Sequence, residues 1–164
     1  MKKKFWLLFT MLFSLAIGFM TTTNNANAAA YGARSYTTPR ATRGTWYFKS
    51  HKNIAAMPAT ILYRKIRITK HSITFYARTS AGLHGRYLLR KTPRKWPSDK
   101  KQIAAERYAE RHHWMSPRNM TRHGFDYSSY WLYSYDGPCY GNIKAKHGRL
   151  IVMTSSASRD TFIK

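Results

Sequence analysis

The amino-acid sequence predicts a mainly β protein, a small antiparallel meander barrel with one inserted α-helix near 99-113. Three observations support this fold class. Short segments alternate apolar with polar residues at the two-residue period of a half-buried strand. Turn residues such as Gly, Pro and Asp divide these segments at regular intervals, which is typical of barrels and sandwiches. The segment 99–113 lacks Gly, Pro and Val and begins with a helix-capping pattern.

Residues 1–28 predict a secretory signal peptide. Lys2–Lys4 form a basic start, Phe5–Met20 an apolar stretch, and Ala26–Ala28 a small-x-small pattern, so we expect cleavage after Ala28. The apolar stretch is shorter than the roughly 20 residues that span a bilayer. We therefore expect a mature protein without a stable transmembrane segment, secreted to the extracellular space or loosely associated with the cell wall.

The charge is strongly positive and unevenly distributed. The chain has 29 Lys and Arg residues against six Asp and Glu, and Asp99 is the first acid. Cleavage would remove three lysines, leaving 26 cations against six acids and a net charge of +20. A small domain needs a net charge of only about 2 to 8 to stay soluble. The excess predicts an anionic partner, because like charges on one domain repel each other.

Cysteine usage and length suggest a single exported domain. Cys139 is the only cysteine in the sequence, so we expect no intramolecular disulfide. Exported chains with almost no cysteine are typical of Gram-positive secretion, where teichoic acids are abundant anionic polymers. Cleavage of 28 of the 164 residues leaves 136, which fits one domain, and we expect a monomer.

The mature chain is expected to have two parts. Residues 29–43 are rich in Ala, Thr, Ser and Arg without an apolar period, which predicts a flexible basic arm. Residues 44–164 are expected to form a single β-rich domain. Its first strand is predicted at Thr45–Lys49, where aromatic and β-branched residues follow Gly44.

Alternation is clearest in the segments that follow. Residues 65–68 and 72–78 each place apolar side chains on one face and polar side chains on the other. Lys70–His71 between them has the length of a tight hairpin turn. Residues 86–90 predict a further strand.

The inserted helix is bounded by recognisable signals. Pro93 and Pro97 make the preceding segment irregular, and Ser98 or Asp99 offers an N-cap. The apolar residues of 99–113 gather on one side of the helix, which we expect to lie against the sheet.

The C-terminal part predicts more strands. A loop containing Pro117 follows the helix, and strands are expected at 140–146, 150–153 and 161–163. His147–Gly148 is a predicted hairpin turn between the first two. The sequence thus predicts about eight short strands and one helix.

Two short patches resemble known barrels. Gly44-Thr45-Trp46-Tyr47 resembles the first strand of calycin barrels of the lipocalin and avidin type, where a Gly-x-Trp begins strand one and the Trp closes the barrel floor. Ser158–Phe162 is loosely similar to the last strand of avidin-type barrels. Phe48 stands where avidins have the Asn that contacts biotin, so the resemblance does not imply biotin binding. The whole chain resembles small secreted basic proteins of lactic-acid bacteria with unassigned function, which implies secretion and a barrel.

A basic cluster around Trp96 predicts a surface for polyanions. Charge supplies affinity for phosphate chains, and a ring can pack on sugar or base faces. The expected partners are anionic cell-wall polymers of the teichoic-acid type or other polyanions, with help from Arg34, Arg40 and Arg43 in the arm. The predicted polyanion-binding residues are Arg90, Lys91, Arg94, Lys95, Trp96, Lys100, Lys101, Arg107 and Arg111.

Two other functions fit the sequence. A calycin-like carrier would hold a small apolar or sugar ligand, with Trp46, Tyr130, Trp131 and Tyr133 as the candidate ligand pocket. Such rings can equally fill a small barrel completely. A cationic membrane-active protein would need a basic amphipathic helix, whereas the segment 99–113 also carries three acids.

We predict no catalytic site, no metal and no cofactor. The seven His residues lack metal-ligand spacing, and His112 and His113 would point about 100° apart on a helix. Glu106 and Glu110 share a helix face, where carboxylates usually pair with basic neighbours. A secreted hydrolase or nuclease is the alternative enzyme class, but no residue pair indicates one.

Overall fold

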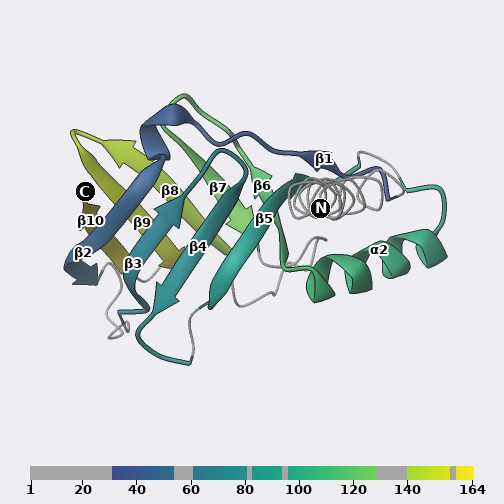
Figure 1. Ribbon diagram of the computed structural model, residues 1–164, viewed down its shortest axis with the longest axis horizontal. Coiled ribbons are helices and arrows are strands. Elements are labelled where there is room, and N and C mark those ends of the chain that lie inside the picture. The colour runs from purple at the N-terminus through teal and green to yellow at the C-terminus, as the bar shows by residue number, and fades with distance from the viewer. Residues whose placement is uncertain (1–30, 54–60, 81–82, 94–95, 129–139, 156–157) are drawn as a thin grey trace, which may run out of the picture.

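The alternating segments of the sequence form a closed β-barrel with one helix beside it in the computed structural model (Figure 1). This confirms the predicted mainly β barrel with one inserted helix. The structure describes residues 31–53, 61–80, 83–93, 96–128, 140–155 and 158–164. The strands of the barrel are β2 (Gly44–Asn53), β3 (Tyr63–Ile68), β4 (Ser72–Ala77), β5 (Gly85–Lys91), β6 (Trp114–Arg118), β7 (Gly124–Ser128), β8 (Tyr140–Lys146), β9 (Arg149–Ser155) and β10 (Ser158–Ile163).

These nine strands form a ring with one parallel contact. The order is β5-β4-β3-β2-β10-β9-β8-β7-β6, and β6 pairs with β5 to close it. Neighbours in a ring with an odd number of strands cannot all be antiparallel. The parallel pair is β5–β6, with Leu88 opposite Trp114. Parallel neighbours need a crossover connection, and α2 (Asp99–Arg111) provides it.

The helix α2 begins at the predicted cap. Ser98 Oγ accepts a hydrogen bond from the Lys101 backbone N–H at 3.4 Å. The helix ends two residues before the predicted 113, and His113 has a left-handed φ of 51°. A small second hydrophobic cluster packs the helix on the barrel. Its buried members are Ala33, Ala105, Ala109 and Trp114.

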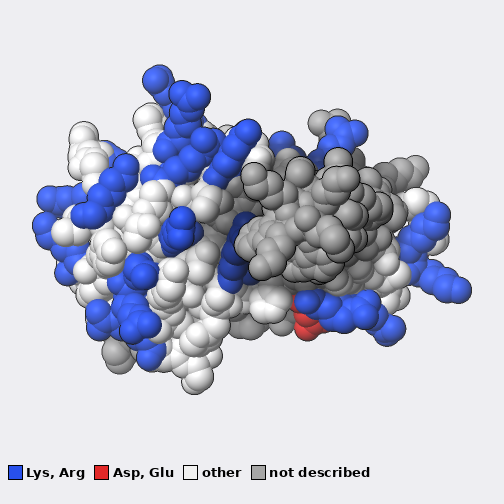
Figure 2. All heavy atoms as spheres, in the orientation of Figure 1, with Lys and Arg blue, Asp and Glu red and all other residues white. Residues whose placement is uncertain are grey.

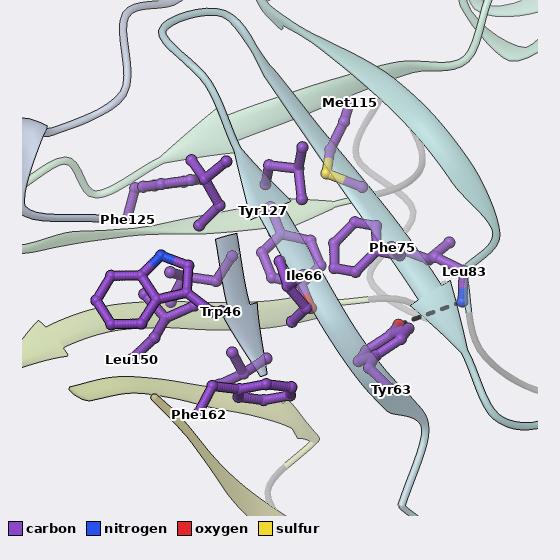
Figure 3. Close-up of a cluster of buried hydrophobic side chains, with 14 of the residues drawn as sticks. Trp46, Tyr63, Ile66, Phe75, Leu83, Met115, Phe125, Tyr127, Leu150 and Phe162 are labelled. Atoms are coloured by element: carbon purple, nitrogen blue, oxygen red, sulfur yellow. Dashed lines mark hydrogen bonds between the residues drawn. The ribbon is translucent and has the colours of Figure 1, made fainter. Parts of the chain in front are cut away.

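Side chains from all around the wall fill the barrel interior (Figure 3). Trp46, Phe75 and Tyr127 are each no more than 2% exposed. The rings of Phe75 and Tyr127 lie 5.6 Å apart between centroids. The Tyr63 hydroxyl accepts a hydrogen bond from the Leu83 backbone N–H at 3.2 Å. The described interior is therefore a packed core.

Residues 31–43 are built into the domain, which differs from the predicted flexible arm. The short strand β1 (Arg34–Ser35) pairs with β5, and the 3-10 turn η1 (Arg40–Thr42) follows. Tyr36 is 1% exposed, and its ring centroid lies 5.6 Å from that of Phe125. The segment has no apolar period because isolated side chains, rather than one face, enter the core.

The strand β6 is not predicted by the sequence, because Pro117 interrupts its pattern. Proline lacks a backbone N–H and is therefore confined to places where a ladder does not need that donor. The register sets Pro117 opposite Tyr127 of β7, whereas the pairing with β5 involves Trp114 and Met115. Pro117 thus lies beyond the end of the ladder to β5.

Tyr36 tests whether the segment 31–43 contributes to the core. Tyr36→Ala should destabilise the protein by about 3–5 kcal/mol, because a buried aromatic ring is lost. Tyr36→Phe should be at least as stable as the wild type, since the buried hydroxyl has no hydrogen-bond partner among the described residues. Urea unfolding of the three proteins measures both effects. Wild-type stability in Tyr36→Ala would contradict a role for this segment in the core.

The buried phenol of Tyr36 should also lower the stability of the fold at alkaline pH. Burial, with the Asp126 charge adding to it, raises the pKa of Tyr36 from 10.0 to about 12. The folded protein therefore holds the phenol proton more tightly than the unfolded chain does. This contribution to stability is complete below the unfolded pKa and is lost as the pH rises through the folded one. Unfolding free energies measured from pH 10 to 12 should fall less in Tyr36→Phe, and parallel curves would refute the assignment.

Candidate functional site

The Asp and Glu side chains that the structure describes are segregated from the outer wall of the barrel. The helix α2 carries three of the six acids. Asp126 and Asp160 are 8% and 0% exposed, and Asp136 lies outside the described residues. In the described strands, the wall therefore presents exposed cations without an exposed Asp or Glu side chain. Figure 2 shows blue side chains spread over β2–β5, whereas the red atoms in that view lie beside α2.

Both buried acids are bonded to neighbouring side chains. Asn119 and Asn142 each donate an amide hydrogen to a different carboxylate oxygen of Asp126. Asp160 Oδ1 lies 2.6 Å from His51 Nδ1, a contact that becomes an ion pair when the imidazole is protonated. This contact joins β10 to β2. The two acids thus stabilise local contacts within the barrel.

Two predicted polyanion-binding residues are not placed on the open surface that the prediction assumed. Arg90 is 8% exposed, and its guanidinium carbon lies 5.6 Å from the centroid of the Trp114 ring. Burial lowers the pKa of Arg90. Trp96 is half-buried and packs against the second cluster. Because both side chains belong to the packing between α2 and the barrel, they present little surface to a polymer.

The other predicted contact residues lie on α2 or close to it. Lys91 is exposed, with its Nζ 5.7 Å from the centroid of the Tyr36 ring. Arg94 and Lys95 lie outside the described residues. The helix has three acids beside its four cations, so its net positive charge is small. Its exposed cations are Lys100, Lys101, Arg107 and Arg111.

The three basic residues expected to help from the arm have different environments. Arg34 and Arg40 are exposed. Arg43 donates hydrogen bonds from Nε and Nη2 to the Thr38 carbonyl oxygen, at 3.2 and 2.6 Å. Arg43 therefore braces the chain just before β2.

A cationic hollow lies at the end of the barrel that η1 covers. It has a volume of about 560 Å³. The buried Trp46 and Ala145 lie at its base, and its other lining residues are exposed. The lining contains no Asp or Glu among the residues that the structure describes. The hollow is lined by Ala41, Trp46, His123, Lys144, Ala145, Lys146, His147, Gly148, Arg149 and Lys164.

The first barrel strand shapes the base of this hollow. The Trp46 indole N–H donates a hydrogen bond to the Thr42 carbonyl oxygen at 2.8 Å. Lys164 Nζ lies 5.1 Å from the centroid of the Trp46 ring, within the range of a cation–π interaction. Gly44 has a φ of 132°, and a Cβ there would lie 3.3 Å from Lys164 Cε. The Gly44–Trp46 segment thus positions the Trp46 ring at the base of the hollow.

The β8–β9 hairpin brings like charges together at the hollow. Lys146 is directly opposite Arg149 in the register, and Lys144 lies on the same face of β8. His147 and Gly148 make the turn with positive φ angles of 49° and 71°. Like charges directly opposite each other destabilise an antiparallel pair. An anion bound between them would remove this repulsion.

The hollow was not among the predicted sites, although part of it has a sequence signal. Lys144 and Lys146 alternate with apolar residues and are followed by the turn and by Arg149. This pattern predicts a strand with a basic outer face. Lys164 and Trp46 join the hairpin only because β2 and β10 pair at the barrel seam. The alternation of apolar and polar residues along the sequence gives no information about this contact between distant strands.

The candidate ligand pocket of the sequence analysis is only partly described. Trp46 is 1% exposed and belongs to the packed core as well as to the base of the hollow. Tyr130, Trp131 and Tyr133 lie outside the described residues. The described part of the interior is filled by side chains.

The described residues contain no group of three or more His, Cys, Asp or Glu side chains that could hold a metal ion. None of their helices has the length and apolar character needed to cross a membrane. Cys139 lies outside the described ranges.

The buried carboxyl of Asp160 should make the free energy of unfolding depend on pH. Burial raises the pKa of Asp160 above 3.8, while the hydrogen bond from His51 and the charges of His51 and Arg78 oppose this rise. The folded protein thus binds the carboxyl proton more tightly than the unfolded chain. The Asp160 contribution to stability is complete below the unfolded pKa and decreases as the pH rises through the raised one. The wild type should therefore lose stability relative to Asp160→Asn over this window.

Urea unfolding of both proteins at intervals from about pH 3 to pH 8 measures this difference. The difference between the two proteins reports the titration of Asp160 together with that of His51, which contacts its carboxylate. A difference that does not change with pH would contradict the assignment.

Comparison of the chain with protein-family models, with curated proteins and with solved structures finds no match.

Proposed function

We propose that the protein is a secreted, strongly basic β-barrel that associates electrostatically with anionic cell-envelope polymers of the teichoic-acid type. The observation that carries this proposal is the cationic hollow. Lys144, Lys146 and Arg149 line it together with Lys164, and no lining Asp or Glu in the described chain balances them. Binding of this kind needs no catalytic group and no cofactor.

Repulsion within the hollow favours an external anion. Lys146 and Arg149 are opposite each other in the hairpin register, so two like charges stay on neighbouring positions while the strands are paired. Phosphate groups would reduce this repulsion and release counterions from the polymer, which supplies the free energy of association. Affinity should therefore fall steeply as the salt concentration rises.

The predicted signal peptide supports a partner outside the cell. Residues 1–28 combine a basic start, an apolar stretch and a small-x-small cleavage pattern. Phosphate-rich wall polymers are the anions that an exported protein of a Gram-positive cell would meet first. A protein with this charge would be retained at the wall without a covalent anchor.

The other candidate functions receive less support from the described residues. A ligand carrier needs interior space, whereas rings such as Phe75 and Tyr127 pack against each other inside the barrel. A membrane-active helix should be uniformly basic on its polar face, whereas α2 carries three acids.

Co-sedimentation with Gram-positive cell walls tests the proposal. Mature protein should bind intact walls and lose binding on walls stripped of teichoic acid, over about 50 to 500 mM salt. The variant Lys144→Ser/Lys146→Ser/Arg149→Ser should reduce the log–log salt slope by about 2 to 3, because each lost phosphate contact removes roughly one counterion.

The matched control removes the same charge from α2, as Lys100→Ser/Lys101→Ser/Arg111→Ser. These cations are exposed but share their helix with the acids, so this variant should bind more tightly than the hollow variant. Equal weakening by the two variants would show that net charge, rather than the hollow, determines binding. Salt-insensitive binding of the wild type would contradict the proposed function itself.

A further inference from the structure

A row of outward-facing side chains crosses the barrel wall from the cationic hollow. Each member lies directly opposite the next in strand register, from β8 through β9, β10, β2 and β3 to β4. Neighbouring strands lie about 4.8 Å apart, so six strands span roughly 24 Å. The members of this outer row are Lys146, Arg149, Ile163, Tyr47, Lys65 and Tyr76.

The centre of the outer row is apolar. Tyr47 is 53% exposed and Ile163 is 38% exposed, and the two are direct cross-strand neighbours. Their chain neighbours Trp46 and Phe162 point into the core, so strand alternation places Tyr47 and Ile163 outside. Polar residues are the usual choice at such positions. Two adjacent, exposed large apolar side chains with cations on both sides therefore indicate a contact surface.

Cations flank this apolar centre on both sides. Arg149 and Lys146 lie on the β8–β9 side. Lys65 lies on the β3 side, with its Nζ 3.9 Å from the centroid of the Tyr76 ring. Arg67 is exposed two residues further along β3, on the same face. The order along the wall is thus charge, apolar surface, charge.

We infer that the outer row binds a phosphate polymer whose repeating unit contains a sugar ring. Phosphates pair with Arg149 on one side and with Lys65 on the other. The ring packs its apolar C–H face on Tyr47 and Ile163 between them, which removes apolar surface of both partners from water. This inference rests on the proposed function and specifies its ligand.

Charge alone leaves the apolar centre unexplained. A polyanion without rings, such as inorganic polyphosphate, satisfies the cations of the outer row but leaves Tyr47 and Ile163 in water. A sugar-bearing polymer covers them as well and gains a contribution that salt does not screen. The two polymers therefore distinguish ring contact from simple neutralisation.

The experiment compares the affinities of mature protein for two probes at matched salt. One probe is purified wall teichoic acid with a glycosyl ring in each repeat, and the other is long-chain inorganic polyphosphate. Tyr47→Ser/Ile163→Ser should lower the ratio of these affinities about tenfold, because the apolar contact with the sugar ring is lost. Tyr47→Phe keeps the ring and should retain the wild-type ratio.

Ile103→Ser/Met120→Ser provides the matched control. These two apolar side chains are 47% and 55% exposed and lie outside the outer row, so the variant should keep the wild-type ratio. An unchanged ratio in Tyr47→Ser/Ile163→Ser would overturn the inference while leaving polyanion binding intact. Equal loss of the ratio in the control would overturn it too. A wild type that binds neither polymer would instead contradict the proposed function.

Discussion

Closure of a nine-stranded ring is the constraint on which the other features of the structure depend. An odd ring requires one parallel contact, and the β5–β6 pair meets this requirement through the crossover that contains α2. The helix lies beside the wall rather than within it (Figure 1). Because α2 carries the acids Asp99, Glu106 and Glu110, their charges are kept away from the outer faces of β8, β9 and β10. As a result of this topology, the exposed cations of the described wall have no exposed Asp or Glu side chains beside them on the strands.

Closure also fixes which side chains point inward. On β2, Trp46 enters the core and Tyr47 faces solvent, and on β10, Phe162 and Ile163 divide in the same way. The described interior is filled by packed rings, so it offers no space for a ligand there. The proposed function accordingly uses the outer wall and one end of the barrel. The cationic hollow and the outer row meet at Lys146 and therefore form one continuous surface.

The parts that the sequence predicts are those governed by local periodicity. Residues 65–68 and 72–78 alternate cleanly, and both strands and their turn lie where predicted. The segment 31–43 has no apolar period, because Tyr36 packs in the barrel core as an isolated side chain. The strand β6 is missed because Pro117 interrupts its strand pattern. The hollow depends on the pairing of the first and last barrel strands, which are far apart in the sequence. The density of Lys and Arg along the sequence instead predicts a polyanion site around Trp96, where the ring is half-buried against the second hydrophobic cluster.

Attraction to net charge and binding to side chains that only folding brings together would affect the stability of the protein differently. The unfolded chain carries the same net charge of +23 as the folded one, so it also attracts polyanions. A ligand stabilises the folded state only to the extent that it binds that state better than the unfolded one. Tyr47 and Ile163 become neighbours only when β2 and β10 pair, and Lys146 meets Arg149 only within the hairpin. Stabilisation by a polymer would therefore arise from the register of the closed barrel, whereas general attraction to its charge would leave the folding equilibrium unchanged.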